Sequence, residues 1–162
     1  MTSSAASRAR SRRPTSARRA LTQADYERLA RLRHLLRRFL AFSEQAAEHK
    51  GLTAQQHQAM LAIKGFGAHR ALSTGELASL LGIRHHSAVG LVDRLAAGGL
   101  VRRQAGTDDR RQVFIRLTAR AEGLLHELSS AHRDELERLA PLLRPLLAHF
   151  EGAAANPTVG ST

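Results

Sequence analysis

Apolar residues recur at steps of three and four along most of the chain, which is the spacing of one face of an α-helix. The first such stretch starts after Thr22, a residue that can cap a helix, and Asp25 follows three residues later. It continues to a stop at Gly51 and carries Leu29, Leu32, Leu36 and Phe39. The pattern predicts a long amphipathic helix at the start of the ordered chain.

Two further capping boxes predict the next helices. Thr53-x-x-Gln56 opens a short helix that is expected to end near Lys64, before Gly65 and Gly67. Ser73-x-x-Glu76 opens another, which ends at Gly82. A fourth helix is predicted from about His85 to Ala97, where Gly98 and Gly99 stop it.

The period then changes from helical to alternating. Leu100-Val101 and Val113-Phe114-Ile115 are short β-prone runs, and the turn formers Gly106, Asp108 and Asp109 lie between them, which predicts a β-hairpin. Thr118 is expected to cap a further helix. Pro141 would lose a hydrogen bond inside that helix, so it is predicted to begin a separate last helix. The expected fold class is mainly α with a small β-hairpin.

Composition and charge narrow the function classes. The 162 residues suit one domain, and 25 basic against 14 acidic residues give a net charge of +11. Lys50 and Lys64 are the only lysines, and arginine binds phosphate oxygens in pairs, so a polyanionic partner is indicated. There is no cysteine for a disulfide or a thiolate metal site. The chain also has no bilayer-length apolar run and no signal-peptide apolar region, so we expect a cytoplasmic protein without membrane contact.

Both ends of the chain differ from its middle. Residues 1–20 carry six arginines and no acid among Ser, Thr, Pro and Ala, which predicts a disordered basic tail. A phosphate-binding arm remains a sharper alternative for this tail. An organelle transit peptide is a third interpretation, although no amphipathic period supports it. Residues 152–162 are expected to form a flexible C-terminal tail.

The most informative segment is Ser73–Leu95. It holds two helix patterns joined by about three residues around Gly82, which predicts a helix-turn-helix. The small side chain of Ala78 fits the place where two such helices must approach closely. The second helix has one apolar stripe, formed by Ala88, Leu91, Val92 and Leu95. Its other face offers side chains that can contact bases in the major groove, namely His85, His86, Ser87 and Val89. The plain alternative is an ordinary solvated helix face. An arginine-rich hairpin directly behind this unit makes it a winged helix-turn-helix.

Taken together, these segments resemble the MarR family of winged helix-turn-helix transcription regulators from about Asp25 to Phe150. The motifs that carry the resemblance are ELASLLGIRHHSAVGLVDRLAAGGLV at 76–101 and DRRQVFIRLT at 109–118. The resemblance implies a DNA-binding region at 52–117 and dimerisation helices at 21–51 and 118–151. It also implies a homodimer on a pseudo-palindromic double-stranded DNA operator, with a wing arginine in the minor groove.

The site residues follow from this resemblance. The minor-groove arginine is Arg111, and Asp109 would orient it, although a turn former and a surface charge are the plain alternatives. The expected phosphate contacts are Arg102, Arg103 and Arg110, with Arg84 and Arg94 as lesser candidates. A ligand-responsive repressor is the function that the resemblance implies.

An effector is the least determined part of this interpretation. Without cysteine or tryptophan the chain lacks what the thiol-based and urate-responsive members use. Its histidines form no compact metal set, only the loosely spaced Glu44, His49 and His57, so neither a metal nor a cofactor is predicted. A small aromatic or phenolic effector is implied by the family alone. The candidate residues of its binding site are Phe39, Phe42, His57, Met60 and Leu61. The same residues fit equally well as ordinary parts of the hydrophobic core.

Two other function classes compete with a transcription regulator. An enzyme is not expected, because G-x-S-x-G, P-loop and H-E-x-x-H motifs are absent and the carboxylates mostly alternate with arginine on helix faces. A sequence-nonspecific architectural DNA-binding protein is the alternative to a regulator. A regulator should prefer its operator over bulk DNA by roughly 10³-fold or more, and an architectural protein by far less.

Overall fold

The structure is a computed structural model and describes residues 20–106 and 113–154. The expectations for the basic tail up to residue 19 and for the wing tip with Asp109, Arg110 and Arg111 lie outside these ranges. The flexible C-terminal tail predicted for residues 152–162 lies outside them only from residue 155 on, and its first three residues still belong to the last helix, so the predicted start of the tail is wrong. The elements in chain order are α1 (Gln23–His49), α2 (Ala54–Phe66), β1 (Leu72–Ser73), α3 (Thr74–Leu81), α4 (His85–Ala97), β2 (Val101–Ala105), β3 (Val113–Leu117) and α5 (Ala119–Ala154).

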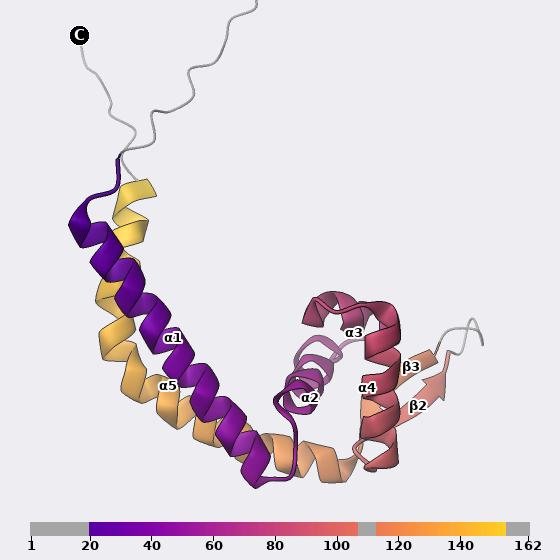
Figure 1. Cartoon of the computed structure of the whole chain (residues 1–162). Coiled ribbons are helices and arrows are strands. Elements are labelled where there is room, and N and C mark those ends of the chain that lie inside the picture. The colour runs from indigo at the N-terminus through magenta and orange to yellow at the C-terminus, as the bar shows by residue number, and fades with distance from the viewer. Residues whose placement is uncertain (1–19, 107–112, 155–162) are drawn as a thin grey trace, which may run out of the picture.

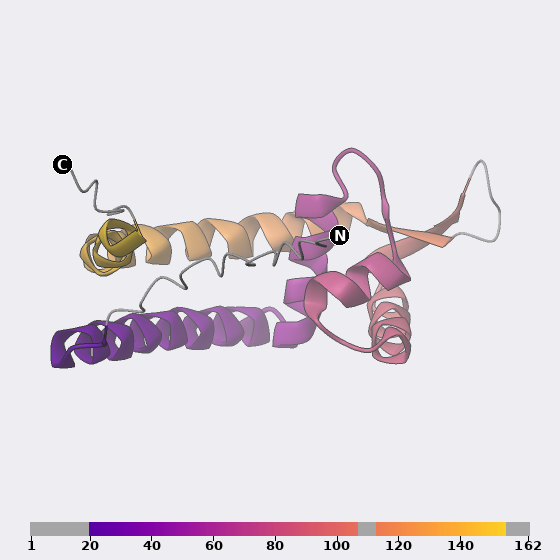
Figure 2. The ribbon, with the colours of Figure 1, turned by 90° about the horizontal axis from the view of Figure 1, so that it is seen from above.

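Two long helices form an arm, and the shorter elements form a compact body at one end of it. The helices α1 and α5 lie side by side over most of the length of α1, as both views show (Figure 1, Figure 2). The hairpin of β2 and β3 extends away from the body on the side opposite the arm (Figure 2). The fold class, mainly helical with a small β-hairpin wing, is confirmed.

Side-chain caps begin the helices where the sequence predicts them. Thr22, Thr53 and Ser73 each accept a hydrogen bond from a backbone N–H of the first helical turn, and each makes a reciprocal capping box. Thr118 caps α5 through the amide of Ala121, 3.2 Å away. Each cap satisfies donors that the helix itself leaves unpaired, which is why these four positions start helices.

A left-handed turn joins α3 to α4. Gly82 ends α3 with φ +63° and ψ +31°, a conformation that glycine adopts without the strain that a Cβ atom brings. Ala78 is buried on α3, as its small size predicted. The range of α4, His85–Ala97, is the one that the sequence predicted.

The sheet has three antiparallel strands in the order β1-β3-β2. The hairpin pairs Val101 with Leu117 and Ala105 with Val113, which confirms the predicted wing and extends both strands. The short strand β1 pairs Leu72 with Ile115, and the sequence analysis did not predict it. Because β1 directly precedes α3, this pairing anchors the first helix of the helix-turn-helix to the wing.

The hydrophobic core lies in the compact body. It combines residues of α2, α3, α4 and the sheet with the first half of α5, and its fully buried large side chains include Met60, Leu77, Leu91, Leu95 and Ile115. The far part of the arm is different, because several large apolar side chains there are exposed. They are Tyr26, Leu29, Leu36, Leu40, Leu136, Leu142 and Leu147.

The predicted break at Pro141 is wrong, because α5 continues through both Pro141 and Pro145. Each proline removes one N–H from the helical ladder and leaves a carbonyl four residues earlier without its partner. Both proline side chains are exposed, so water can reach that side of the helix. The helix curves along α1 beyond its middle, as expected when prolines bend a helix (Figure 1). The second helix also runs past its expected end near Lys64, through Gly65 to Phe66.

Within the described ranges, no helix combines the length and the apolar character needed to cross a membrane.

The turn between α3 and α4 generates a test of stability. Gly82→Ala should lower the free energy of unfolding by about 1–2 kcal/mol, because an L-residue is strained at positive φ. No neighbouring atom lies within 4 Å of the added Cβ position, so backbone conformation alone sets the cost. Urea denaturation followed by circular dichroism measures this change.

The matched control for Gly82→Ala is Gly123→Ala, which lies within α5 and also has open space around its Cβ position. It should raise the free energy by up to about 1 kcal/mol. Equal effects of the two substitutions would contradict the strained turn.

Candidate nucleic-acid interface

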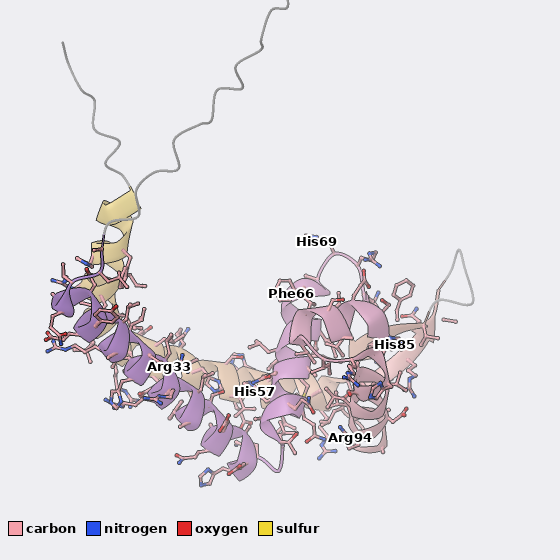
Figure 3. All side chains as sticks on the ribbon, turned by 45° about the horizontal axis from the view of Figure 1, so that its top comes forward. Arg33, His57, Phe66, His69, His85 and Arg94 are labelled. Carbon is pink, nitrogen blue, oxygen red and sulfur yellow. The ribbon has the colours of Figure 1, made fainter. Side chains whose placement is uncertain are left out.

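The helix α4 divides into a buried and an exposed face. Ala88, Leu91, Val92 and Leu95 have no exposed surface, so one side of the helix is locked against the core. On the other side His85 and His86 are exposed, Ser87 is partly exposed, and Val89 keeps 37% of its surface. Figure 3 shows His85 near the start of α4 and Arg94 near its end. The structure therefore brings the sequence-predicted base-contacting residues onto one accessible helix surface.

Arginines lie on this helix, at its N-terminal end and on the neighbouring strand β2. Arg84 is the N-cap residue of α4, is exposed, and makes no side-chain cap hydrogen bond. The guanidinium of Arg94 lies back along the helix, 3.5 Å from the place where a Cβ on Gly90 would stand. Arg102 and Arg103 are exposed on β2. All four candidate phosphate contacts in the described residues are therefore reachable from solvent.

Arg103 has an additional role that the sequence analysis missed. Its guanidinium donates to the carboxylate of Asp93 on α4, with a nitrogen–oxygen distance of 2.5 Å. This ion pair joins the wing to the exposed face of α4. Across the hairpin, Arg102 stands opposite Arg116, which donates to the side-chain oxygen of Gln104 at 3.0 Å. The outer face of the hairpin is therefore basic on both strands, and Arg116 was not among the predicted site residues.

A second ion pair that the sequence analysis did not predict lies at the N-terminal end of α3. Arg70 donates to Glu76, and its guanidinium carbon also lies 5.9 Å from the centre of the Phe114 ring on β3. The backbone N–H of Ser73 donates to the same carboxylate at 2.8 Å. These hydrogen bonds favour the ionised form and lower the pKa of Glu76 to about 2, the contact with Ser73 having the largest effect.

Comparison with known proteins identifies the family of this module. A sequence model of the MarR family matches residues 50–112, which contain α2, the helix-turn-helix and β2. This segment of the chain is similar to the MarR family. The resemblance inferred from the two sequence motifs is thereby confirmed, and MarR-family proteins are transcription regulators rather than enzymes.

Individual relatives agree with this assignment. The chain is 32% identical over 77 residues to YfiV of Bacillus subtilis (strain 168), an HTH-type transcriptional regulator. That alignment covers 48% of this chain and 48% of the relative, so it spans about half the length of the curated relative.

Two solved structures share the fold. A mutant of MepR from Staphylococcus aureus, bound to an oligodeoxyribonucleotide, matches with a TM-score of 0.62 at 17% identity, covering 80% of this chain and 97% of that one. AbsC of Streptomyces coelicolor, a MarR family transcriptional regulator, matches with a TM-score of 0.61 at 19% identity, covering 83% and 99%.

Three of the five candidate effector residues, Phe39, Phe42 and His57, meet where the arm joins the body. The His57 ring of α2 stacks on the His132 ring of α5 at a centroid distance of 4.9 Å, and Phe39 and Phe42 of α1 each meet His132 edge-on at 5.8 Å. Figure 3 shows His57 at this junction. Met60 is fully buried in the core, whereas Leu61 is 49% exposed. We call Phe39, Phe42, His57 and His132 the junction cluster.

His132 was not predicted to belong to this cluster. Its position four residues after the buried Leu128 is the signal that could have placed it on the inner face of α5. The Nε2 atoms of His57 and His132 are both buried without a hydrogen-bond partner. Buried polar atoms are usually hydrogen-bonded, so these two nitrogens distinguish the junction cluster from the apolar core around it.

The described residues form no metal-binding set of side chains. Across residues 20–106 and 113–150, no group of three or more His, Asp or Glu side chains is placed to hold an ion. His49 is exposed and pairs its Nδ1 with the carbonyl oxygen of Gln45 at 2.6 Å, whereas His57 is buried.

The junction cluster makes stability depend on pH. Burial, and secondarily the charge of His132, lower the pKa of His57 below its ordinary value of about 6.5. The unfolded chain therefore takes up a proton more readily than the folded one. The contribution of His57 to the free energy of unfolding is complete above pH 6.5. It is lost as the pH falls through the lowered pKa of His57 in the folded protein.

Urea denaturation at a series of pH values measures this effect. The free energy of unfolding should fall between pH 7.5 and pH 5, and His57→Leu should flatten that dependence. His126→Gln, at an exposed position on the same helix as His132, serves as the control and should leave the slope unchanged. An equal slope in the wild type and His57→Leu would contradict the proposed origin.

Proposed function

We propose that this chain is a MarR-type transcription regulator that binds a double-stranded DNA operator as a homodimer. The observation that carries the proposal is α4, whose inner face is locked in the core while its polar face stands exposed beside a basic hairpin. An α-helix of this kind fits the major groove of B-DNA, and the adjacent hairpin fits the neighbouring groove. The oligodeoxyribonucleotide bound to the MepR mutant supports the same partner for this chain.

The proposed roles follow from position and chemistry. His85, His86, Ser87 and Val89 read bases, because imidazole and hydroxyl groups can donate or accept and a valine methyl can meet thymine. Arg84, Arg94 and Arg102 contact phosphates, and Arg103 does so while sharing its guanidinium with Asp93. Arg110 is proposed as a further phosphate contact. Arg111, oriented by Asp109, is proposed to enter the minor groove. Asp109, Arg110 and Arg111 lie outside the described residues.

The second copy is proposed to cover the arm. Large apolar side chains are exposed along α1 and around the two prolines of α5. Between the two helices lies an apolar groove of about 570 Å³, lined by Leu35, Pro141, Leu142 and Leu146 among others. A monomer rarely leaves so much apolar surface in water. Symmetric burial of two arms would also present two copies of α4 to a two-fold operator.

Ligand response is the finer part of the proposal. The junction cluster lies between the arm and the body, so a small aromatic or phenolic effector inserted there would change how the two parts sit. Aromatic faces and two unpaired ring nitrogens suit a flat molecule that carries a hydroxyl or carboxyl group. Repression is the direction of control proposed, by family likeness, and a role on DNA places the protein in the cytoplasm.

Base reading and phosphate contact should separate by mutation once genome-wide binding has located an operator. His86→Ala should weaken operator binding by about 1–3 kcal/mol and leave random DNA almost unaffected. Arg102→Ala should weaken both about equally and reduce the salt dependence, because phosphate contacts carry no sequence information. Fluorescence anisotropy of the wild type and both variants on the two duplexes measures the six affinities.

The same titrations distinguish the two function classes. A regulator should prefer its operator over random DNA by roughly 10³-fold or more. Equal affinity of the wild type for both duplexes, with equal losses caused by His86→Ala, would support a sequence-nonspecific architectural protein and contradict the assignment of α4 as a recognition helix.

A further inference from the structure

An open groove separates the recognition helix from the wing. Its volume is about 600 Å³, and it is bordered by the loop before β1, the first turn of α3, the first half of α4 and β3. Two of its lining residues, His85 and Val89, belong to the proposed base-reading surface. The opposite wall carries Arg70, Glu76 and Phe114. The groove is therefore continuous with the surface proposed to face the bases.

The topology of a DNA duplex determines what must occupy this groove. When a helix lies in the major groove and a hairpin enters the adjacent minor groove, one sugar–phosphate strand separates the two grooves. That strand has to pass between the helix and the hairpin. In this chain the path between α4 and the hairpin is the groove, so phosphate groups would come closest to the residues of its walls.

Arg70 is the cation of this groove. One edge of its guanidinium donates to Glu76, and its plane lies near the ring of Phe114. Glu76 is itself fixed, because the backbone N–H and hydroxyl of Ser73 donate to it at 2.8 and 2.9 Å. The Arg70 side chain nevertheless keeps 63% of its surface exposed. An arginine has five N–H donors, so those not directed at Glu76 remain available to a phosphate.

We propose that Arg70 is a phosphate clamp, pre-oriented by Glu76 and Phe114, that holds the sugar–phosphate strand running between the recognition helix and the wing. This inference rests on the proposed function and extends it to a residue outside the helix-turn-helix and the hairpin. The ring and the carboxylate fix the guanidinium before DNA arrives, so less side-chain freedom is lost on binding. Because Glu76 already offsets part of its charge, Arg70 contributes through geometry as well as through attraction.

Salt dependence of duplex binding tests the clamp directly. Arg70→Gln should weaken binding about 5–20-fold on operator and random duplex alike and reduce the slope of log K against log salt by about 0.9, the value for one lost phosphate contact. Arg70→Lys keeps a charge but not the planar fork, so it should restore the slope while recovering only part of the affinity.

A matched control removes another arginine that pairs with a glutamate. Arg133 lies on α5 within 4.0 Å of Glu137 and is 73% exposed, so Arg133→Gln deletes an equal charge away from the groove. It should leave the slope unchanged. Phe114→Leu removes only the aromatic platform, and it should lower affinity less than Arg70→Gln does. Thermal unfolding of each variant verifies that the fold is intact.

The outcomes separate the clamp from the function on which it rests. If the wild type binds duplex with a steep salt dependence and folded Arg70→Gln keeps the same slope, the clamp is wrong and the proposed function stands. If the wild type binds no duplex at any salt concentration, the proposed function fails and the clamp fails with it. A slope reduced equally by Arg133→Gln would also overturn the clamp, because the effect would then reflect net charge alone.

Discussion

Burial of one face of α4 is the constraint on which the rest of the structure depends. Four apolar side chains of this helix have no exposed surface, so its rotation about its own axis is determined by the core. The polar face then has only one direction available, toward solvent. The αL turn at Gly82 sets where the helix begins, and the contacts of α3 with β1 and of α5 with β3 hold the surrounding elements in place. A recognition surface built on a helix held in this way changes little when DNA binds, which favours specificity.

Ion pairs connect the exposed arginines to this rigid helix pair. Arg103 reaches Asp93 on α4, and Arg70 reaches Glu76 on α3. Both pairs are exposed, and exposed pairs contribute little to stability. Their more important effect is on position, because each holds an arginine side chain at a defined place beside the proposed path of the phosphates. In the proposed function, the large positive charge of the chain would attract a polyanion at long range, and the paired arginines would determine how it is held.

Local signals explain how much of the fold could be predicted from the sequence. The capping box at Ser73 and the glycine at 82 located the helix-turn-helix, because these signals act within a single turn of chain. The continuous α5 could not be predicted in this way, since packing of the helix along α1 overrides the local cost of Pro141 and Pro145. Strand β1 could not be predicted either. Its two residues are too few to show an alternating pattern, and they form a strand only by pairing with the distant strand β3.

The candidate site shows the same division. The exposed face of α4 was predictable because helical periodicity separates it from the apolar stripe. The roles of Arg70 and His132 were not, because each depends on partners on other elements: Arg70 lies over Phe114 of β3, and His132 stacks on His57 of α2. Contacts of this kind become visible only when the chain is folded.

The central claim is that two copies of α4, held by symmetric arms, read two half-sites on one face of the duplex. The most direct measurement is the affinity for an operator in which 5 base pairs are inserted between the half-sites. Half-sites of such dimers lie about one helical turn, or 10–10.5 base pairs, apart, so this insertion turns one half-site to the opposite face. The account predicts that affinity then falls to about that of random DNA, while an insertion of about 10 base pairs is less damaging. Unchanged affinity after the half-turn insertion would contradict recognition by a rigid dimer.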